Sequence, residues 1–243
     1  MDMHTSGHAQ DITPTPCIID ALPIENLPDL IIFDCDGVLV QSEEITLSVL
    51  AKLFNAHLLD RRPEWPPLEI NDCIRRFRGR KINTCLDELQ DEYSTVLPLY
   101  FETVLREQAL SLYTTDLQAT EGIIDLVSSL NTRLCVASSA PRSKIEQCLK
   151  LTRLWPWFEG KVFSCYDVGT WKPDPLVFQT ACLSNSVNPD RALVIEDSIP
   201  GVQAAVAAGI RVLGFGPPDR HPELKKAGAV TFSRMNQLHG LMA

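Results

Sequence analysis

The chain has 243 residues, of which 45% are hydrophobic and 22% are charged. This length suits one substantial domain or a core domain with an insertion, and the composition argues against a disordered, collagen-like or membrane-embedded chain. The formal net charge is −9, from 31 acidic and 22 basic residues, which argues against a surface built to bind nucleic-acid phosphates. We therefore expect no nucleic acid and no membrane as partners, and a phosphorylated ligand must meet a local basic patch.

The eight cysteines form no CxxC pair and no zinc-ligand spacing, which is typical of reduced core thiols in a protein of this length. No basic segment followed by an apolar run begins the sequence, and no apolar stretch approaches the roughly 18–20 residues of a transmembrane helix. We expect a cytoplasmic protein, either a monomer or a weak homodimer. Residues 1–27 lack periodicity and are rich in Pro, Asp and Thr, which predicts a loosely ordered tail.

The first firm element is a strand at residues 30–33, an apolar run that suits a strand buried on both faces of a parallel sheet. A helical pattern starts near Ser42 and continues to about residue 118 without a buried strand. Helix and strand patterns alternate after that point. In chain order they are a helix from Thr120, a strand at 134–137, a helix after Pro141, a weaker strand at 162–163, a helix opened by Asp174 and Pro175, a strand at 192–195, a helix at 202–208 and a strand at 210–213.

This alternation predicts an α/β fold with a doubly wound, mainly parallel, Rossmann-like sheet core and an inserted α-helical cap domain. The long helical stretch separates the first strand from the rest of the sheet. The expected core therefore comprises residues 28–44 and 119–243, and the expected cap comprises residues 45–118.

Polar residues stand where four segments of the predicted sheet end. Ligands bind at the carboxyl ends of strands in open parallel sheets, so folding should bring these residues together. Several carboxylates at one point are unfavourable unless a cation neutralises them, and Mg²⁺ prefers oxygen ligands and bridges carboxylates to phosphates. A lysine and a hydroxyl group beside them would hold phosphate oxygens. The residues concerned are Asp34, Asp36, Ser138, Lys172, Glu196 and Asp197.

Four motifs resemble those of the haloacid dehalogenase superfamily, in its phosphatase branch. They are DCDGVLV at 34–40, Ser138 in VASSAP, Lys172 in WKPDP, and IEDSIPG at 195–201, within a resemblance that extends over residues 29–215. The resemblance implies that Asp34 attacks phosphorus to form an aspartyl phosphate. It also implies that Asp36 protonates the leaving oxygen and then activates water.

The same resemblance implies a set of binding residues. Mg²⁺ would be held by Asp34, by the backbone carbonyl of Asp36 and by Asp197, with Glu196 as a further ligand or as the partner of one. Ser138 and Lys172 would bind the phosphoryl group. Dehalogenases of the superfamily lack the second aspartate, so the resemblance favours a phosphatase.

Each of these residues also has a purely structural interpretation. The pattern Asp-x-Asp-Gly is typical of turns and calcium loops, although the remaining ligands of an EF-hand do not follow Asp36 at the required spacing. Ser138 could cap a helix, Lys172 could be a solvated lysine, and Glu196 could cap the helix that follows it.

Residues 75–81 place five cations in a seven-residue stretch of an acidic protein. The structural interpretation is a solvated helix end, and the functional one is a basic loop that closes over the site and meets the distal anionic part of a substrate. Arg78 and Arg80 are the favoured contacts. The segments RFRGRKI at 76–82 and FSCYDVGTWKPDP at 163–175 resemble those of bacterial 6-phosphogluconate phosphatases.

We predict a Mg²⁺-dependent phosphatase that hydrolyses a small phosphorylated sugar or sugar acid. A phosphosugar mutase of the β-phosphoglucomutase type is the first alternative. It is weakened because Thr46 and Ile82 stand where the mutase has a hinge histidine and a cap arginine, although Arg80 or Lys81 could substitute. A non-catalytic protein that binds phosphorylated metabolites is the third hypothesis.

Overall fold

The core of the protein is one sheet of six parallel strands, in the order β3-β2-β1-β4-β5-β6. The computed structural model describes residues 27–78 and 80–242, so the predicted tail lies outside the described residues except for Leu27. The strands are β1 (Leu30–Phe33), β2 (Arg133–Ser138), β3 (Val162–Ser164), β4 (Ala192–Glu196), β5 (Arg211–Phe215) and β6 (Val230–Phe232). The predicted parallel α/β core is confirmed.

Strand β1 lies inside the sheet, between β2 and β4, and all four of its residues are fully buried. Its side chains alternate between two apolar clusters. Ile31 and Phe33 belong to one cluster, and Leu30 and Ile32 belong to the other. The uninterrupted apolar run of β1 follows from this arrangement, because both faces of the sheet are covered.

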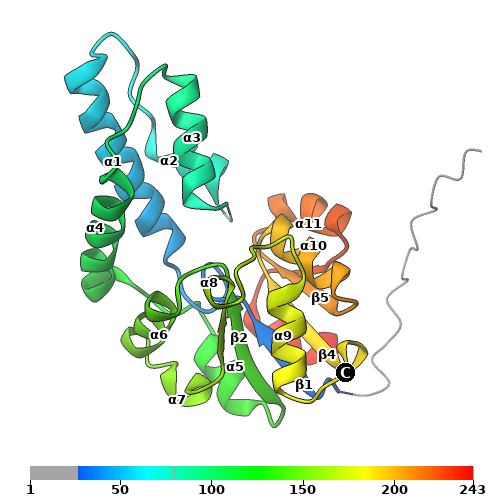
Figure 1. Cartoon of the computed structure of the whole chain (residues 1–243). Helices are drawn as coiled ribbons and strands as arrows, with labels where there is room; N and C mark the ends of the chain where they lie inside the picture. The colour runs from blue at the N-terminus through cyan, green and yellow to red at the C-terminus, as the bar shows by residue number, and fades with distance from the viewer. Residues whose placement is uncertain (1–26, 79, 243) are drawn as a thin grey trace, which may run out of the picture.

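Helices cover both faces of the sheet, as Figure 1 shows. Helices α9 and α10 contribute Phe178 and Val202 to the cluster of Ile32, and α6 and α7 contribute Ile145 and Phe158 to the cluster of Phe33. The core helices are α5 (Ile123–Ser129), α6 (Arg142–Leu151), α7 (Trp155–Phe158), α8 (Cys165–Val168), α9 (Leu176–Ser184), α10 (Ile199–Ala207), α11 (His221–Ala227) and α12 (Leu238–Met242).

Four helices between β1 and β2 form a separate lobe beyond the carboxyl end of β1, which we call the helical cap (Figure 1). They are α1 (Glu43–Arg61), α2 (Ile70–Phe77), α3 (Ile82–Glu92) and α4 (Phe101–Asp116). Helix α1 packs against α2 and α4, and the cap has an apolar interior that includes Phe54, Phe77, Leu89 and Leu105. Helix α1 begins two residues before the expected cap boundary at residue 45. The division into domains stays a prediction.

Two local features differ from the sequence prediction. The helix expected from Thr120 begins at Ile123, after Gly122 with a φ of +76°. The Thr120 hydroxyl instead accepts a hydrogen bond of 2.7 Å from Gln41 Nε2, which joins the two chain segments that connect core and cap. Strand β6 was not predicted, because three residues with Val230 half-exposed give no recognisable apolar run.

The seven cysteines in the described part of the chain are free and buried, and Cys17 lies outside it. Burial raises the pKa of the Cys73, Cys85 and Cys148 thiols to about 12. These thiols are therefore neutral at physiological pH and pack as small apolar groups. Within residues 27–78 and 80–242, no helix is both long and apolar enough to cross a lipid bilayer.

Candidate active site

A cavity of about 400 Å³ lies where β1, β2 and β4 end beneath the cap. The register of the sheet explains why distant residues meet there, since Phe33 pairs with Val136 on one side and with Ile195 on the other. Residues that follow these three positions must then lie side by side. The cavity wall includes all six polar residues singled out at the strand ends, namely Asp34, Asp36, Ser138, Lys172, Glu196 and Asp197.

Lys172 links three segments of the chain at the floor of the cavity through hydrogen bonds. Its Nζ donates to Asp34 Oδ1 at 2.5 Å, to Glu196 Oε1 at 2.6 Å and to the Ala137 carbonyl oxygen at 3.0 Å. Only 4% of its side chain is exposed, so it is not a solvated surface lysine. Burial acts to lower the pKa of Lys172, but the Asp34 and Glu196 carboxylates outweigh burial and raise it. The lysine therefore stays charged beside the carboxylate that is expected to be the nucleophile.

Glu196 connects this ion pair to the start of α10. Its Oε2 accepts hydrogen bonds of 2.9 Å from the backbone N–H and from the hydroxyl of Ser198. The Ser198 hydroxyl oxygen in turn accepts from the Gly201 N–H and caps the helix. Glu196 thus supports the residue that caps the helix and binds Lys172 with its other oxygen.

Asp197 is a buried carboxylate without a direct partner. It is 6% exposed, and within the described residues its side chain makes no hydrogen bond and no ion pair. Its pKa is raised well above the ordinary value by burial and by the nearby Glu43 and Glu196 carboxylates. Burial also raises the pKa of Asp34, and the neighbouring carboxylates raise it further. Lys172 acts to lower this pKa but does not outweigh them.

These carboxylates fit a divalent cation. An unpaired buried carboxylate is unfavourable, and a bound cation would offset its charge. Gly37 leaves no room for a side chain at this point, because a Cβ atom there would lie 2.3 Å from Asp197 Oδ2. Within the described residues, no group of three or more His, Cys, Asp or Glu side chains is arranged so that it could hold a metal ion. Mg²⁺ keeps several waters and accepts carbonyl ligands, so it can be held by fewer than three carboxylates.

Asp36 is bound by a residue that sequence reasoning missed. Lys144 Nζ donates to Asp36 Oδ1 at 2.8 Å and to Oδ2 at 2.9 Å, and the Ser42 hydroxyl also donates to Oδ1. Burial acts to raise the pKa of Asp36, but Lys144 and Ser42 together lower it. Nothing in the sequence distinguishes Lys144 from a surface lysine of α6, and only the position of that helix directs it into the site.

Ser138 is the last residue of β2 and is almost fully buried on the cavity wall. Its Oγ accepts a hydrogen bond of 3.2 Å from the Ala140 N–H, so the side chain supports the turn that leads toward α6. In the described residues the hydroxyl group has no acceptor of its own. Its hydrogen is therefore available to an oxygen in the cavity.

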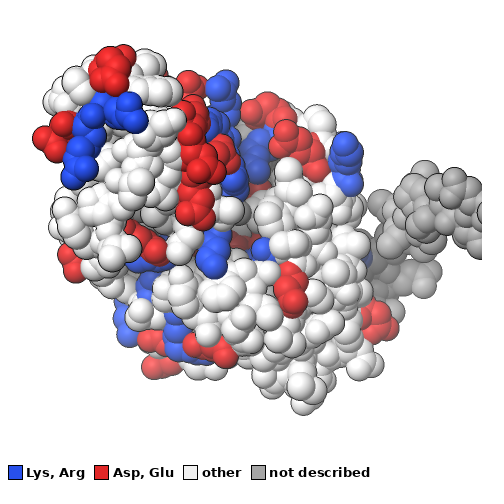
Figure 2. Space-filling view, turned by 45° about the horizontal axis from the view of Figure 1, so that its top comes forward, with Lys and Arg blue, Asp and Glu red and all other residues white. Residues whose placement is uncertain are grey.

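The basic run at residues 75–81 is largely ion-paired. Arg78 donates to Glu44 Oε1 at 2.6 Å, and Arg80 donates to Glu88 Oε2 at 2.7 Å. Arg80 lines the cavity, and Arg78 does not belong to the described residues that do. Acidic and basic side chains lie next to one another at the boundary between the cap and the core, as Figure 2 shows.

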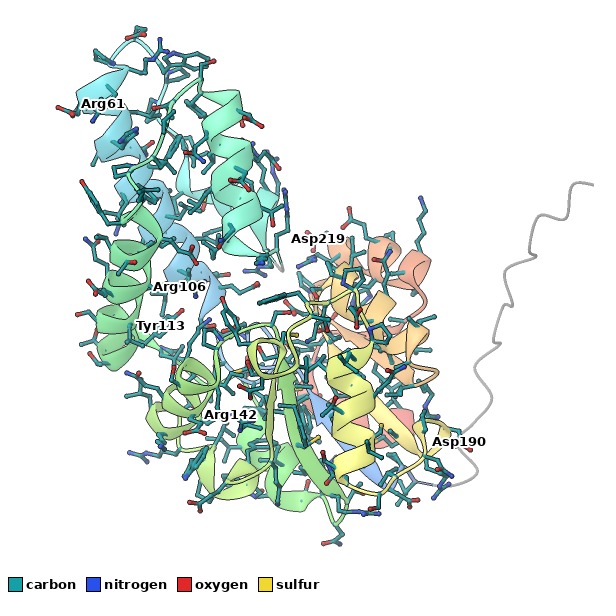
Figure 3. The ribbon with its side chains drawn as sticks, viewed as in Figure 1. Arg61, Arg106, Tyr113, Arg142, Asp190 and Asp219 are labelled. Atoms are coloured by element: carbon teal, nitrogen blue, oxygen red, sulfur yellow. The ribbon has the colours of Figure 1, made fainter. Side chains whose placement is uncertain are left out.

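Two further cap cations line the cavity and touch aromatic side chains of the core. Lys81 Nζ lies 4.0 Å from the centre of the Trp171 ring, and Arg106 Nη2 donates to the Tyr166 hydroxyl at 3.2 Å. Arg106 belongs to α4 (Figure 3). Lys81 belongs to the predicted basic run, whereas no sequence signal singled out Arg106.

The sequence model of the haloacid dehalogenase-like hydrolases matches residues 31–215, and the chain belongs to this family. It is 29% identical over 211 residues to 6-phosphogluconate phosphatase of Escherichia coli (strain K12), covering 86% of this chain and 92% of the relative. It is 27% identical over 191 residues to phosphorylated carbohydrates phosphatase of Thermotoga maritima, covering 76% and 84%. The structure of a haloacid dehalogenase-like protein of unknown function from Agrobacterium tumefaciens superposes with a TM-score of 0.76 and 32% identity, covering 88% and 97%.

These findings confirm the predicted family and fold. The chain is a hydrolase of the haloacid dehalogenase-like family, and its predicted enzyme class, a phosphatase, agrees with both relatives.

Proposed function

We propose that the protein is a Mg²⁺-dependent phosphatase that hydrolyses a small phosphorylated sugar or sugar acid through an aspartyl-phosphate intermediate. The observation that carries the proposal is the buried pair of Asp34 and Lys172, which stands beside the unpaired carboxylate of Asp197. A carboxylate is a competent phosphoryl acceptor, and a fixed lysine offsets the charge of the phosphoryl oxygens. The names of the two curated relatives agree with this class of substrate.

In the first step, an Asp34 carboxylate oxygen forms a bond to phosphorus while the bond from phosphorus to the substrate's ester oxygen breaks. The electron pair of that bond goes to the ester oxygen, which takes a proton from Asp36. Asp36 must carry this proton when substrate is bound, although Lys144 lowers the pKa of the free carboxyl group. Lys172 and the Ser138 hydroxyl orient the phosphoryl group by donating to its oxygens. The dephosphorylated alcohol leaves with the proton from Asp36.

In the second step, Asp36 as a carboxylate takes a proton from a water molecule, whose oxygen attacks phosphorus. The bond between phosphorus and Asp34 breaks, its electron pair returns to the carboxylate, and phosphate leaves. Asp34, Asp197 and the backbone carbonyl of Asp36 would hold Mg²⁺, with Glu196 as a further ligand or the partner of one. When bound, the cation neutralises the charge that builds up on the phosphoryl oxygens.

The cap supplies the groups that would select the substrate. Arg80, Lys81 and Arg106 line the cavity, so we assign the distal anionic contacts to these three residues rather than to Arg78. Trp171 lines the cavity, and its buried indole N–H has no hydrogen-bond partner within the described residues. Cations and an N–H donor on the wall suit a polyhydroxy chain with a carboxylate at its far end.

Closure of the cap over the core belongs to the same proposal, with residues 45–118 as the moving domain. The two segments that enter and leave the cap run side by side, since the Gln41 N–H donates to the Gln118 carbonyl at 2.9 Å. Such a paired connection allows the cap to approach the core as one body and to exclude water from the site.

Release of inorganic phosphate from a panel of phosphorylated sugars and sugar acids, measured with and without Mg²⁺, tests the proposal. We expect phosphate release only when Mg²⁺ is present, and we expect Asp34→Asn to reduce that release to the background rate. Asp29→Asn is the matched control, because Asp29 is paired with Arg191 at the surface. Unchanged activity in Asp34→Asn would exclude the covalent mechanism. Isomerisation of a hexose 1-phosphate with a bisphosphate activator would favour a mutase, and tight binding without turnover a non-catalytic protein.

A further inference from the structure

Each of the two aspartates in the DCDG motif has its own lysine. Lys172 binds Asp34, and Lys144 binds both carboxylate oxygens of Asp36. The first lysine is part of the phosphoryl site proposed above. The second has no part in either chemical step, although it lies in the cavity wall with only 24% of its side chain exposed.

The contacts of Lys144 fix the direction of the Asp36 carboxylate. One ammonium group that donates to both oxygens defines the plane of the carboxylate, and the Ser42 hydroxyl holds Oδ1 from the first residue before α1. The charge on Lys144 strengthens both hydrogen bonds. The side chain of Asp36 is therefore held at the same time from the core helix α6 and from the residue that precedes the cap helix α1.

Lys144 is itself held in place by the cap. Its Nζ lies 5.7 Å from the centre of the Tyr113 ring, near the end of α4 that is closer to the core (Figure 3). Tyr113 is almost fully buried, and its hydroxyl forms a 2.5 Å hydrogen bond with Thr46 Oγ1 of α1. The lysine thus sits between a carboxylate on one side and the face of an aromatic ring on another.

We propose that Lys144 is a positioning residue, which orients the Asp36 side chain both as the acid that gives a proton to the leaving oxygen and as the carboxylate that takes a proton from the attacking water. The inference rests on the proposed phosphatase function and adds a residue to it. The alternative role for Lys144 is to bind a phosphate oxygen of the substrate. In the structure, however, its ammonium group is bound to both oxygens of Asp36. The two roles predict different kinetics.

The test is the dependence of kcat/KM on the leaving group. This ratio reports the steps up to and including phosphoryl transfer to Asp34, and proton donation to the leaving oxygen matters there only when the leaving group is basic. A series of ring-substituted phenyl phosphates varies leaving-group basicity at nearly constant size. In Lys144→Met we expect kcat/KM to fall by about 10²-fold or more for unsubstituted phenyl phosphate. The dinitro-substituted ester should change by less than about threefold.

Two comparisons show that Lys144 acts through Asp36. Asp36→Asn should show the same steep dependence on leaving-group basicity, and adding Lys144→Met to it should cause little further loss, because residues that act as a unit are not additive. Lys144→Arg keeps the charge and should retain part of the activity toward phenyl phosphate. Lys150→Met is the matched control, since Lys150 lies on the same helix and pairs with Glu146 away from the cavity.

Equal losses for the basic and the activated esters would overturn the proposal in favour of a substrate-binding role, and so would full additivity with Asp36→Asn. An unchanged kcat/KM for every ester would show that Lys144 does not contribute to phosphoryl transfer. If Lys144→Met does not fold, Lys144→Arg and Lys144→Gln are compared for the same change of slope. A wild-type protein that hydrolyses none of the esters would instead contradict the proposed function, so the two failures are distinct.

Discussion

Gly201 lies so close to Glu196 that no side chain fits between them. A Cβ atom at position 201 would lie 1.8 Å from Glu196 Oε1, far inside van der Waals contact. Glu196 is 1% exposed and is bound to Lys172 and Ser198, so its carboxylate has no free space into which it could move. The start of α10 can therefore pack against the floor of the cavity only because residue 201 has no side chain.

Gly201→Ala should therefore destabilise the fold and reduce activity together. Overpacking of this kind costs about 1–3 kcal/mol, and a displaced Glu196 carboxylate would also disturb Lys172. Thermal unfolding and phosphate release measure the two effects. Gly240→Ala is the control, because nothing lies within 4 Å of a Cβ atom at that helical position. We expect that variant to change stability by less than about 1 kcal/mol, and equal behaviour of the two variants would contradict the steric argument.

Lys172→Met should abolish activity and leave two carboxylates, those of Asp34 and Glu196, without their cation. Removing one partner of a buried ion pair costs about 3–5 kcal/mol, so denaturant unfolding at neutral pH should show a loss of this size. The loss should shrink at acidic pH, where Asp34 can take up a proton. Lys161→Met provides the comparison, since Lys161 is exposed and donates only to a backbone carbonyl. A similar loss of unfolding free energy in both variants would show that the buried ion pair contributes no more to stability than the contact of an exposed lysine.

Mg²⁺ should stabilise the protein more at pH 8 than at pH 5. The folded-state pKa values of Asp34 and Asp197 are raised, so the metal-free fold loses stability as pH rises from the unfolded value near 3.9 through the folded values. A bound cation offsets that loss and competes with protons at low pH. At a Mg²⁺ concentration about 100 times the dissociation constant, Tm at pH 8 should rise by roughly 5–10 °C relative to protein in a chelator.

The pH dependence of this stabilisation has a direct control. Asp197→Asn removes the unpaired carboxylate, and we expect the Mg²⁺-induced rise in Tm to disappear in that variant. A rise in Tm that is the same at pH 5 and pH 8 would mean that the cation binds away from these carboxylates.

Lys81→Met should weaken discrimination between a sugar-acid phosphate and the corresponding aldose phosphate. If Lys81 contacts the distal carboxylate, the ratio of the two kcat/KM values should fall about tenfold, equivalent to about 1.4 kcal/mol. Lys52→Met is the matched control, because Lys52 is an exposed cap lysine of α1 that does not line the cavity. An unchanged ratio in Lys81→Met would exclude the contact and direct attention to Arg80 and Arg106.

The sequence was informative wherever a local pattern has only one structural solution. The apolar run at 30–33 is typical of a strand covered on both faces, and the alternation of helix and strand patterns after residue 120 predicted parallel pairing. From that order, the polar residues at the strand ends had to share one edge of the sheet. For the same reason, the six residues from Asp34 to Asp197 could be gathered before any distance was known.

The tertiary structure decided which cations face which carboxylates. Arg78 and Arg80 are equivalent in the sequence, and each pairs with a glutamate of the cap, yet of these two only Arg80 lines the cavity. Lys144 and Arg106 carried no signal, since a lysine or arginine on an amphipathic helix is usually solvated. Local sequence determines strands, turns and strand ends, but the direction of a long flexible side chain depends on neighbours that only the packing of cap and core brings within reach.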